Sequence, residues 1–296
     1  MTHKLTTGQK FIGTGSLLLI GILFGISGVI AKYLSGWLSA YQIVEYRFAI
    51  ALLGLLVITA ALRLPVSLKT VKPTTLLLFA TTYPISVILF TLSIVNGTVV
   101  SAVFAFYAAT LVSSFVIGKL YFNEPIHVYK QLALVFVVTS IVTFTDLPHN
   151  FSISLGLVFG LLSGVIQGIT SAFQKQLSNH TNRTGLLFIQ CLAGVVLTTV
   201  VILFVGQSHF QNLGEIQWLV VLAFGLILLA ITYLFLIGYK YTNLNTGSIL
   251  VSSELFFGPF FALLFLSENL TTNILIGGIL TALAVVFASL NEPAKR

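Results

Sequence analysis

The stretch GTGSLLLIGILFGISGVIAKYLS at residues 13–35 is repeated in outline by GLVFGLLSGVIQGITSAFQKQLS at residues 156–178. An offset of 143 residues aligns three glycines, one lysine and a Leu-Ser pair of the two stretches. Each stretch is apolar over the roughly 20 residues that a helix needs to cross the hydrocarbon core of a bilayer. The repeat therefore predicts a membrane protein built from two related halves.

Apolar runs of similar length follow one another along the whole chain. The mean hydropathy is +1.06 and only 7% of the residues are charged, which is typical of a chain whose solvent is lipid. Short polar breaks separate the runs. We therefore predict an all-α membrane protein with ten transmembrane helices, at residues 12–34, 39–62, 73–95, 98–118, 128–147, 153–174, 184–206, 216–240, 246–266 and 271–290.

The basic residues are distributed unevenly between the two predicted sides of the membrane. Of fourteen Lys and Arg residues, only Lys32 lies near the opposite side and only Arg47 lies inside a span. The positive-inside rule then places both termini in the cytoplasm of a multi-pass protein in the cell (inner) membrane. The charges sit at helix ends, where they face anionic lipid, and form no stripe for nucleic acid. The other basic residues are Lys4, Lys10, Arg63, Lys69, Lys72, Lys119, Lys130, Lys175, Arg183, Lys240, Lys295 and Arg296.

The two halves predict a specific architecture. Residues 1–147 and residues 148–296 each contain five predicted spans, and an offset of 144 residues aligns Glu124 with Glu268. Because five is odd, the second half enters the membrane from the opposite side, so the repeats are inverted. Such repeats form a binding site between the halves near the bilayer midplane and support alternating access.

Three segments resemble a known family. The stretch SILVSSELFFGPFFALLFLSENLT at residues 248–271 resembles the end of an EamA-type domain of the drug/metabolite transporter superfamily. Glu268 and Glu124 match the acidic residue that ends the fourth helix of each EamA repeat, and Arg47 in EYRFA matches the Arg of the second helix. The resemblance implies the ten-helix fold and the export of amino acids or other metabolites.

Charged residues inside spans are candidate functional residues because each costs about 2.5–3.5 kcal/mol at a helix centre. Glu254 lies about 12 Å into the ninth predicted span, at 1.5 Å per residue. It can bind a substrate ammonium or exchange a proton; the alternative is a structural acid bonded to a neighbouring helix. Arg47 is either a carboxylate contact or a structural clamp. Glu45 lies about 200° away from Arg47 on the second span, so the two do not pair.

Neutral side chains complete the predicted binding site. Gln42 and Tyr46 share a helix face with Glu45, and the repeat aligns Gln190 with Arg47. Aromatic rings in such a site can stack on a solute or hold a cation over their faces. Each of these residues can equally serve helix packing. The remaining candidates are Tyr83, Tyr107, Gln167, Ser171 and Ser252.

Several function classes are excluded by missing motifs. The chain has no GxxxxGK[ST] for a P-loop ATPase and no HExxH for a metalloprotease, and its five His residues fall in predicted loops or at helix borders. Its one cysteine, Cys191, allows no disulfide framework. We therefore predict no enzyme activity, no cofactor and no metal site.

The leading expectation is a secondary transporter or facilitator that exports a small polar organic metabolite, an amino acid or related compound, by alternating access. Its expected partners are this solute, the lipid bilayer and protons as a candidate coupling ion. One alternative is uptake or exchange of a cationic solute such as a quaternary amine, with Glu254 as counter-charge. A further alternative is a membrane scaffold or receptor that transports nothing.

Overall fold

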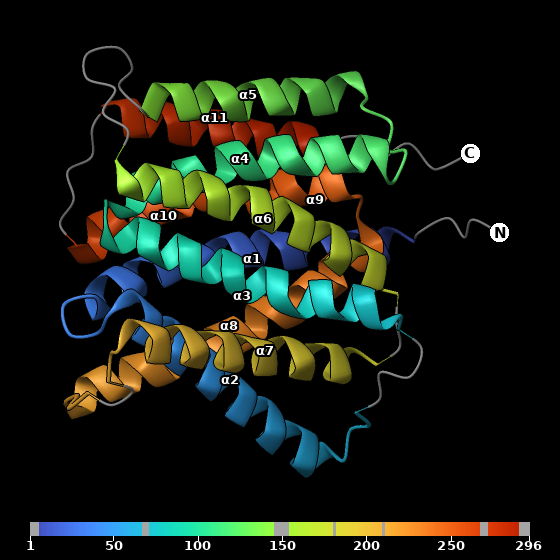
Figure 1. Cartoon of the computed structure of the whole chain (residues 1–296). Helices are drawn as coiled ribbons and strands as arrows, with labels where there is room; N and C mark the ends of the chain where they lie inside the picture. Colours follow the sequence, from blue (N-terminus) through green and yellow to red (C-terminus); the bar gives the residue numbers. More distant parts are fainter. Residues whose placement is uncertain are drawn as a thin grey trace.

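The computed structural model describes residues 6–66, 71–144, 154–179, 182–208, 211–266 and 272–289, and the regular structure in these ranges is helical (Figure 1). Side chains of Thr6, Ser39, Thr98, Ser154 and Asn182 cap helix N-termini by accepting hydrogen bonds from backbone N–H groups. The helices are α1 (Thr7–Leu34), α2 (Ala40–Leu62), α3 (Pro73–Val95), α4 (Val99–Leu120), α5 (Val128–Phe144), α6 (Leu155–Leu177), α7 (Arg183–Val205), α8 (Glu215–Tyr241), α9 (Leu244–Val251), α10 (Glu254–Leu266) and α11 (Thr272–Ser289).

Eight segments of the described chain are long and apolar enough to cross a membrane, with α9 and α10 counted together as Leu244–Leu266. Helices α5 and α11 are shorter apolar helices at the places of the fifth and tenth predicted spans. Large apolar side chains such as Phe204 and Phe265 are exposed, at 88% and 63%, as expected of a surface that faces lipid. The chain is a multi-pass membrane protein, and the structure has helical segments long and apolar enough to cross a membrane at eight of the predicted spans.

The ninth predicted span is not one continuous helix, which corrects the expectation of an unbroken helix over residues 246–266. Helix α9 ends at Val251 and α10 begins at Glu254. Between them the Leu255 N–H donates to the Ser252 carbonyl at 2.8 Å, three residues back, and the Ser252 hydroxyl donates to the Ile249 carbonyl at 2.6 Å. Serine hydroxyls compete with backbone groups for helical hydrogen bonds, so a serine pair can interrupt a helix. The break places Glu254 at a helix start inside the bundle.

The helices pack in pairs taken from the two halves of the chain. Helix α1 packs against α8 and α10, while α3 and α4 pack against α6. Helix α2 packs against α7, and α5 packs against α11 at the opposite edge of the bundle (Figure 1). Glycines in α1 and α6 permit the close approach of neighbouring helices, as at Gly164, where an added Cβ would collide with the Phe106 carbonyl of α4. The bundle therefore has a centre made of α1, α3, α4, α6, α8, α9 and α10.

One end of the bundle, here called the N-side, is where α1 and α9 begin and α4, α6 and α8 end (Figure 1). There the Lys175 ammonium donates to the carbonyl oxygens of Tyr239, at 2.8 Å, and Thr242. The Glu124 carboxylate accepts a 2.6 Å hydrogen bond from the Leu244 N–H at the start of α9. A cation at a helix C-terminus and an anion at a helix N-terminus both complement the helix dipole. These contacts hold the turn between α8 and α9.

The opposite end of the bundle, here called the far side, has a matching lysine. Lys32, near the end of α1, donates to the carbonyl oxygens of Ile94 at 3.2 Å and Gly97 at 2.8 Å, at the end of α3. Nearby, the Ser93 hydroxyl donates to the Gly156 carbonyl of α6 at 2.6 Å. Lys32 thus binds the end of α3 as Lys175 binds the end of α8.

Candidate functional site

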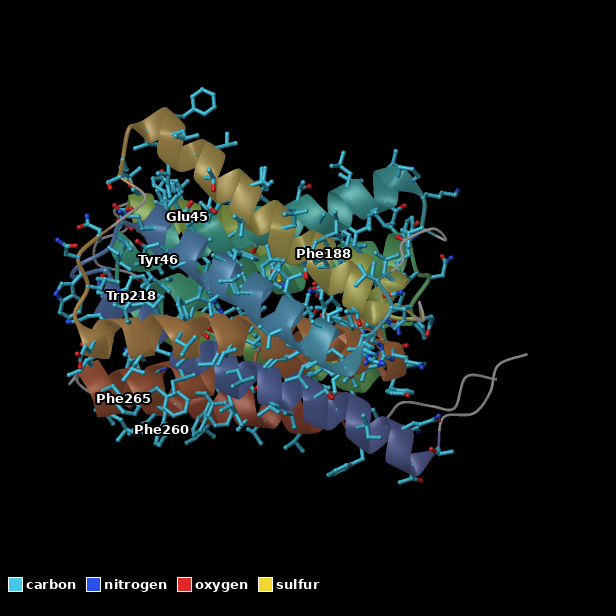
Figure 2. All side chains as sticks on the ribbon, turned by 90° about the horizontal axis from the view of Figure 1, so that it is seen from below. Glu45, Tyr46, Phe188, Trp218, Phe260 and Phe265 are labelled. Carbon is cyan, nitrogen blue, oxygen red and sulfur yellow. The ribbon has the colours of Figure 1, made fainter. Side chains whose placement is uncertain are left out.

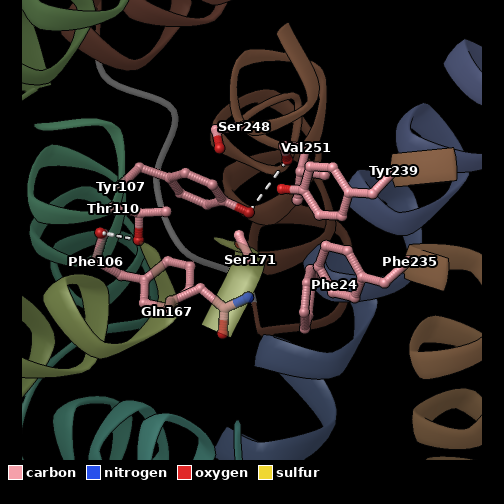
Figure 3. Close-up of a pocket in the computed structure, with 10 residues that line it drawn as sticks. All are labelled: Phe24, Phe106, Tyr107, Thr110, Gln167, Ser171, Phe235, Tyr239, Ser248 and Val251. Carbon is pink, nitrogen blue, oxygen red and sulfur yellow. Dashed lines mark hydrogen bonds between the residues drawn. The ribbon is translucent and has the colours of Figure 1, made fainter. Parts of the chain in front are cut away.

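Two adjoining hollows lie at the centre of the bundle. One lies between α1, α4, α6, α8 and α9 (Figure 3). The other lies between α1, α2, α3, α4, α6 and α10. Phe24, Phe106 and Gln167 line both, so the two hollows adjoin in one central site. The space that a water molecule can enter is about 10 Å³ in the first and about 20 Å³ in the second, so in this arrangement the helices leave little more than the room for a water.

Glu254 lies in the wall of the larger hollow, at the first position of α10. Its Oε2 accepts a 2.7 Å hydrogen bond from the Tyr107 hydroxyl of α4, which also lies 3.1 Å from the Val251 carbonyl. Its Oε1 is buried and has no partner in the described chain. The carboxylate therefore has one oxygen held in place and one oxygen free to bind a donor.

Arg47 lines the same hollow from α2. Its guanidinium carbon lies 4.1 Å from the centre of the Phe224 ring of α8, and its Nη2 lies 3.4 Å from the Ser27 hydroxyl of α1. The ring stacking holds the guanidinium plane. Its Nε is buried without a partner among the described residues. Two opposite charges thus line one hollow, each with an unused hydrogen-bonding atom.

Polar side chains of α3, α6 and α8 line or border the hollows. The Ser86 hydroxyl donates to Gln167 Oε1 at 3.2 Å, which orients that amide. Tyr239 of α8, Ser171 of α6 and Ser248 of α9 line the smaller hollow together (Figure 3). Of the predicted site residues, the structure therefore brings five together at the centre: Glu254, Arg47, Tyr107, Gln167 and Ser171.

Three predicted site residues on α2 lie elsewhere: Glu45 and Tyr46 are at the far side (Figure 2), and Gln42 lies one turn nearer the start of the same helix. Gln42 donates to the Ser208 carbonyl at 2.7 Å and takes part in the capping box of α2. Glu45 accepts a 2.9 Å hydrogen bond from the Thr199 hydroxyl of α7, and the Tyr46 ring stacks on Trp218 with centroids 5.6 Å apart. None of the three lines either central hollow.

Tyr83, Gln190 and Ser252 are buried but also outside the walls of these hollows. The Tyr83 ring packs edge-on against Phe48, and its hydroxyl has no partner in the described chain. Gln190 Nε2 lies 3.5 Å from the Phe79 carbonyl. Ser252 belongs to the break between α9 and α10. Their expected contact with a solute stays a prediction.

Tyr107 was the one aromatic wall residue among the sequence-based candidates, and other aromatic residues of the walls were not predicted. Phe24 and Phe106 line both hollows, and Tyr239 lines the smaller one. The repeat indicates Phe24 as a wall residue, because the offset of 143 residues pairs it with Gln167, a predicted site residue. Glu124, expected only as a family match, holds the start of α9, while Glu268 lies outside the described residues.

Comparisons with known proteins concern the family and the fold. Residues 154–290 match the sequence profile of the EamA-like transporter family. No curated protein matches the chain. A solved structure described as "Crystal structure of protein" is similar to this chain with a TM-score of 0.76 and 14% identity, over 96% of this chain and 98% of that one. At that identity the likeness concerns the fold alone.

Proposed function

We propose that this chain, whose residues 154–290 match the EamA-like transporter family, is a transporter of the drug/metabolite type and not an enzyme. It exports a small zwitterionic metabolite, an amino acid or a related compound, by alternating access. The proposed direction is out of the cytoplasm, across the cell (inner) membrane, with the N-side facing the cytoplasm.

The observation that carries the proposal is the pair of charges around one hollow. Arg47 Nε and Glu254 Oε1 are both buried without partners in the described chain. Tyr107 already binds Glu254, and Phe224 and Ser27 contact Arg47, so the unpaired atoms leave part of the desolvation penalty of each buried group uncompensated; this penalty is of the order of several kcal/mol for a single ion. A zwitterion offsets both penalties, because its carboxylate can bind the guanidinium and its ammonium can bind the carboxylate.

Alternating access by two inverted halves, residues 1–147 and 148–296, is the proposed mechanism. The helix contacts support it, because they are the same when the two halves are interchanged. Helix α1 packs on α8 as its counterpart α6 packs on α3, and α2 packs on its own counterpart α7. The two lysine contacts support it as well, since Lys32 and Lys175 are aligned in the repeat and bind corresponding helix ends on opposite sides. The ten-helix count and cytoplasmic termini belong to this proposal.

Flux in proteoliposomes tests the function. Purified protein should accelerate the exit of one or more radiolabelled amino acids by at least about tenfold over empty liposomes, and Glu254→Gln should abolish that acceleration. Tyr83→Phe, which removes an unpartnered hydroxyl, is a folding control whose melting temperature should equal or exceed that of the wild type. Folded protein without flux across a full amino-acid panel would contradict the proposal.

A second candidate function is the exchange of a cationic solute such as a quaternary amine. It is favoured by the aromatic rings of Phe24, Phe90 and Phe106, which line the same hollow as Glu254. This function predicts that organic cations without a carboxylate compete with the solute, whereas amino acids do not. Competition only by zwitterions would exclude it.

A further inference from the structure

A layer of buried neutral polar side chains lies beyond the smaller hollow. It consists of Ser114 on α4, Gln174 on α6, and Asn245 and Thr246 on α9, each at most 3% exposed. Every side-chain nitrogen and oxygen atom of these four residues is buried without a hydrogen-bond partner in the described chain. Such groups are rare in folded proteins, and each needs a physical explanation.

Two members of the layer continue the polar wall of the hollow along α4 and α6. Ser114 follows Thr110 by four residues and Gln174 follows Ser171 by three, so each lies one turn further along the same helix face. Both helices run towards the N-side from these positions. The polar surface therefore extends from the hollow in that direction.

Asn245 continues the wall along α9, which runs in the opposite direction, and Thr246 follows it in the same helix. Asn245 precedes Ser248, a wall residue, by three residues and is again one turn closer to the N-side. Its amide lies against Gly118 of α4, where an added Cβ would collide with it. Since Gly118 is one turn beyond Ser114, the α4 and α9 parts of the layer face each other.

Beyond the layer, two charged residues hold the N-side closed. Lys175 directly follows Gln174 and binds the carbonyl oxygens of Tyr239 and Thr242. The Glu124 carboxylate accepts a 3.0 Å hydrogen bond from the Asn245 N–H. These charges are paired with backbone groups, whereas the side chains of the layer are not. The layer thus lies between the central hollow and a contact that closes the bundle.

Packing alone does not explain the layer. An unpaired buried polar atom destabilises a fold by about 1–3 kcal/mol. Ser140, equally buried between α5 and α11 at the edge of the bundle, has its hydroxyl bonded to the Gly277 carbonyl at 2.9 Å and close to the Thr281 hydroxyl at 2.9 Å. Ser140 therefore has its hydroxyl paired across the α5–α11 contact, whereas the equally buried Ser114 does not.

We propose that Ser114, Gln174, Asn245 and Thr246 form a hydrogen-bonding gate layer, crossed by water and by the polar groups of the solute between the central hollow and the N-side. The inference rests on the proposed transport function. In the arrangement described here its side chains make no hydrogen bond within the described chain; when the N-side opens, its amides and hydroxyls bind water and solute in succession. Because the layer is neutral and carries both donors and acceptors, it takes both ends of a zwitterion.

Thiol accessibility tests the gate layer without any solute. Ser114→Cys and Thr246→Cys are made in a Cys191→Ser background, placed in lipid nanodiscs that leave both faces open, and exposed to a membrane-impermeant cationic methanethiosulfonate. Both should react at least about tenfold faster than Ser140→Cys, because only a hydrated thiol ionises. Val116→Cys, on the lipid-facing side of α4, should be as unreactive as Ser140→Cys.

Equal, slow reaction of Ser114→Cys, Thr246→Cys and Ser140→Cys would overturn the gate layer. Two cysteine positions on different helices keep the test decisive if one variant fails to fold. The result is independent of the solute: fast labelling without flux for any amino acid sinks the proposed solute class and leaves the gate layer standing. Amino-acid flux with an unreactive layer sinks the gate layer alone.

A second pair of variants separates gating from stability. Gln174→Leu replaces an unpaired amide by an apolar group of similar size, so the melting temperature should stay or rise while flux falls about tenfold. Ser140→Ala removes a paired hydroxyl, so its melting temperature should fall while flux per folded protein is unchanged. A Gln174→Leu variant that melts earlier and transports normally would show a structural glutamine and refute the gate.

Discussion

The Tyr107 hydroxyl donates a 2.7 Å hydrogen bond to Glu254 Oε2, joining the middle of α4 to the first residue of α10. The two residues are 147 positions apart and come from different halves of the chain. This bond holds the carboxylate at the break between α9 and α10, so that Oε1 is the oxygen left for a solute.

Removing the hydroxyl of Tyr107 should destabilise the fold and weaken transport. Tyr107→Phe leaves both carboxylate oxygens of Glu254 without a donor, which should lower the free energy of unfolding by about 1.5–3 kcal/mol. Tyr83→Phe, at an equally buried tyrosine whose hydroxyl has no partner, should change it little. Melting curves of the two variants in one detergent measure the difference. Equal melting temperatures would show that the bond contributes nothing.

Glu254→Gln tests whether transport depends on the charge of this side chain or only on its size. Glu254→Gln keeps the size and an acceptor for Tyr107, so the protein should fold normally. It removes the negative charge and the titratable group, so flux should fall by about tenfold or more and its remainder should not vary with pH. Flux and melting temperature are measured on one preparation across about pH 5.5–8.5, a range that brackets ordinary cytoplasmic and external conditions. Normal flux with an unaltered pH profile would remove Glu254 from the mechanism.

Arg47 should bind the solute carboxylate through the planar shape of its guanidinium and not only through its charge. Arg47→Lys keeps a positive charge but loses the planar group stacked on Phe224 and the fork that binds a carboxylate in two places. The KM for an amino acid should rise about tenfold, with a small change in kcat. The matching amine without a carboxylate is the control solute, and its KM should not change. A similar rise for both solutes would favour a structural clamp.

The two lysines that bind helix ends should both be structural anchors. Lys32→Met and Lys175→Met each leave carbonyl oxygens at the end of α3 or α8 without a charged donor, which should lower stability by about 1.5–3 kcal/mol. Lys119→Met, at an exposed lysine of α4, is the control and should melt as the wild type does. If the inverted arrangement is correct, the two losses should be similar in size.

The proposed orientation can be tested in whole cells. A cysteine at the exposed Gln211 should react with an impermeant maleimide from outside, whereas a cysteine at the exposed Asn179 should react only after permeabilisation. Both variants carry Cys191→Ser, and labelling in detergent checks that each thiol is reactive. The reverse pattern would place the N-side outside the cell.

The helical segments were predictable because membrane insertion depends on local apolar length. Each of the eight segments long and apolar enough to cross a membrane is a run of about 20 apolar residues, and such a run must be helical since lipid offers its backbone no hydrogen bonds. The same argument singled out Glu254 and Arg47, because a charge inside a span needs a partner or a cavity. Their presence as candidates required no knowledge of which helices meet.

The tertiary structure alone decided which candidates share a site. Glu45 and Arg47 lie two residues apart on α2, which packs between α7 and α8. In this packing Glu45 binds Thr199 of α7, whereas Arg47 lines the central hollow. The break at Ser252 and Ser253 also depends on packing, because serines inside apolar helices often leave the helix intact. Whether a segment is a membrane helix depends on its own apolar length, which the sequence shows directly. Whether a residue belongs to the site depends on how each helix is rotated and on contacts between residues more than a hundred positions apart, such as Tyr107 and Glu254.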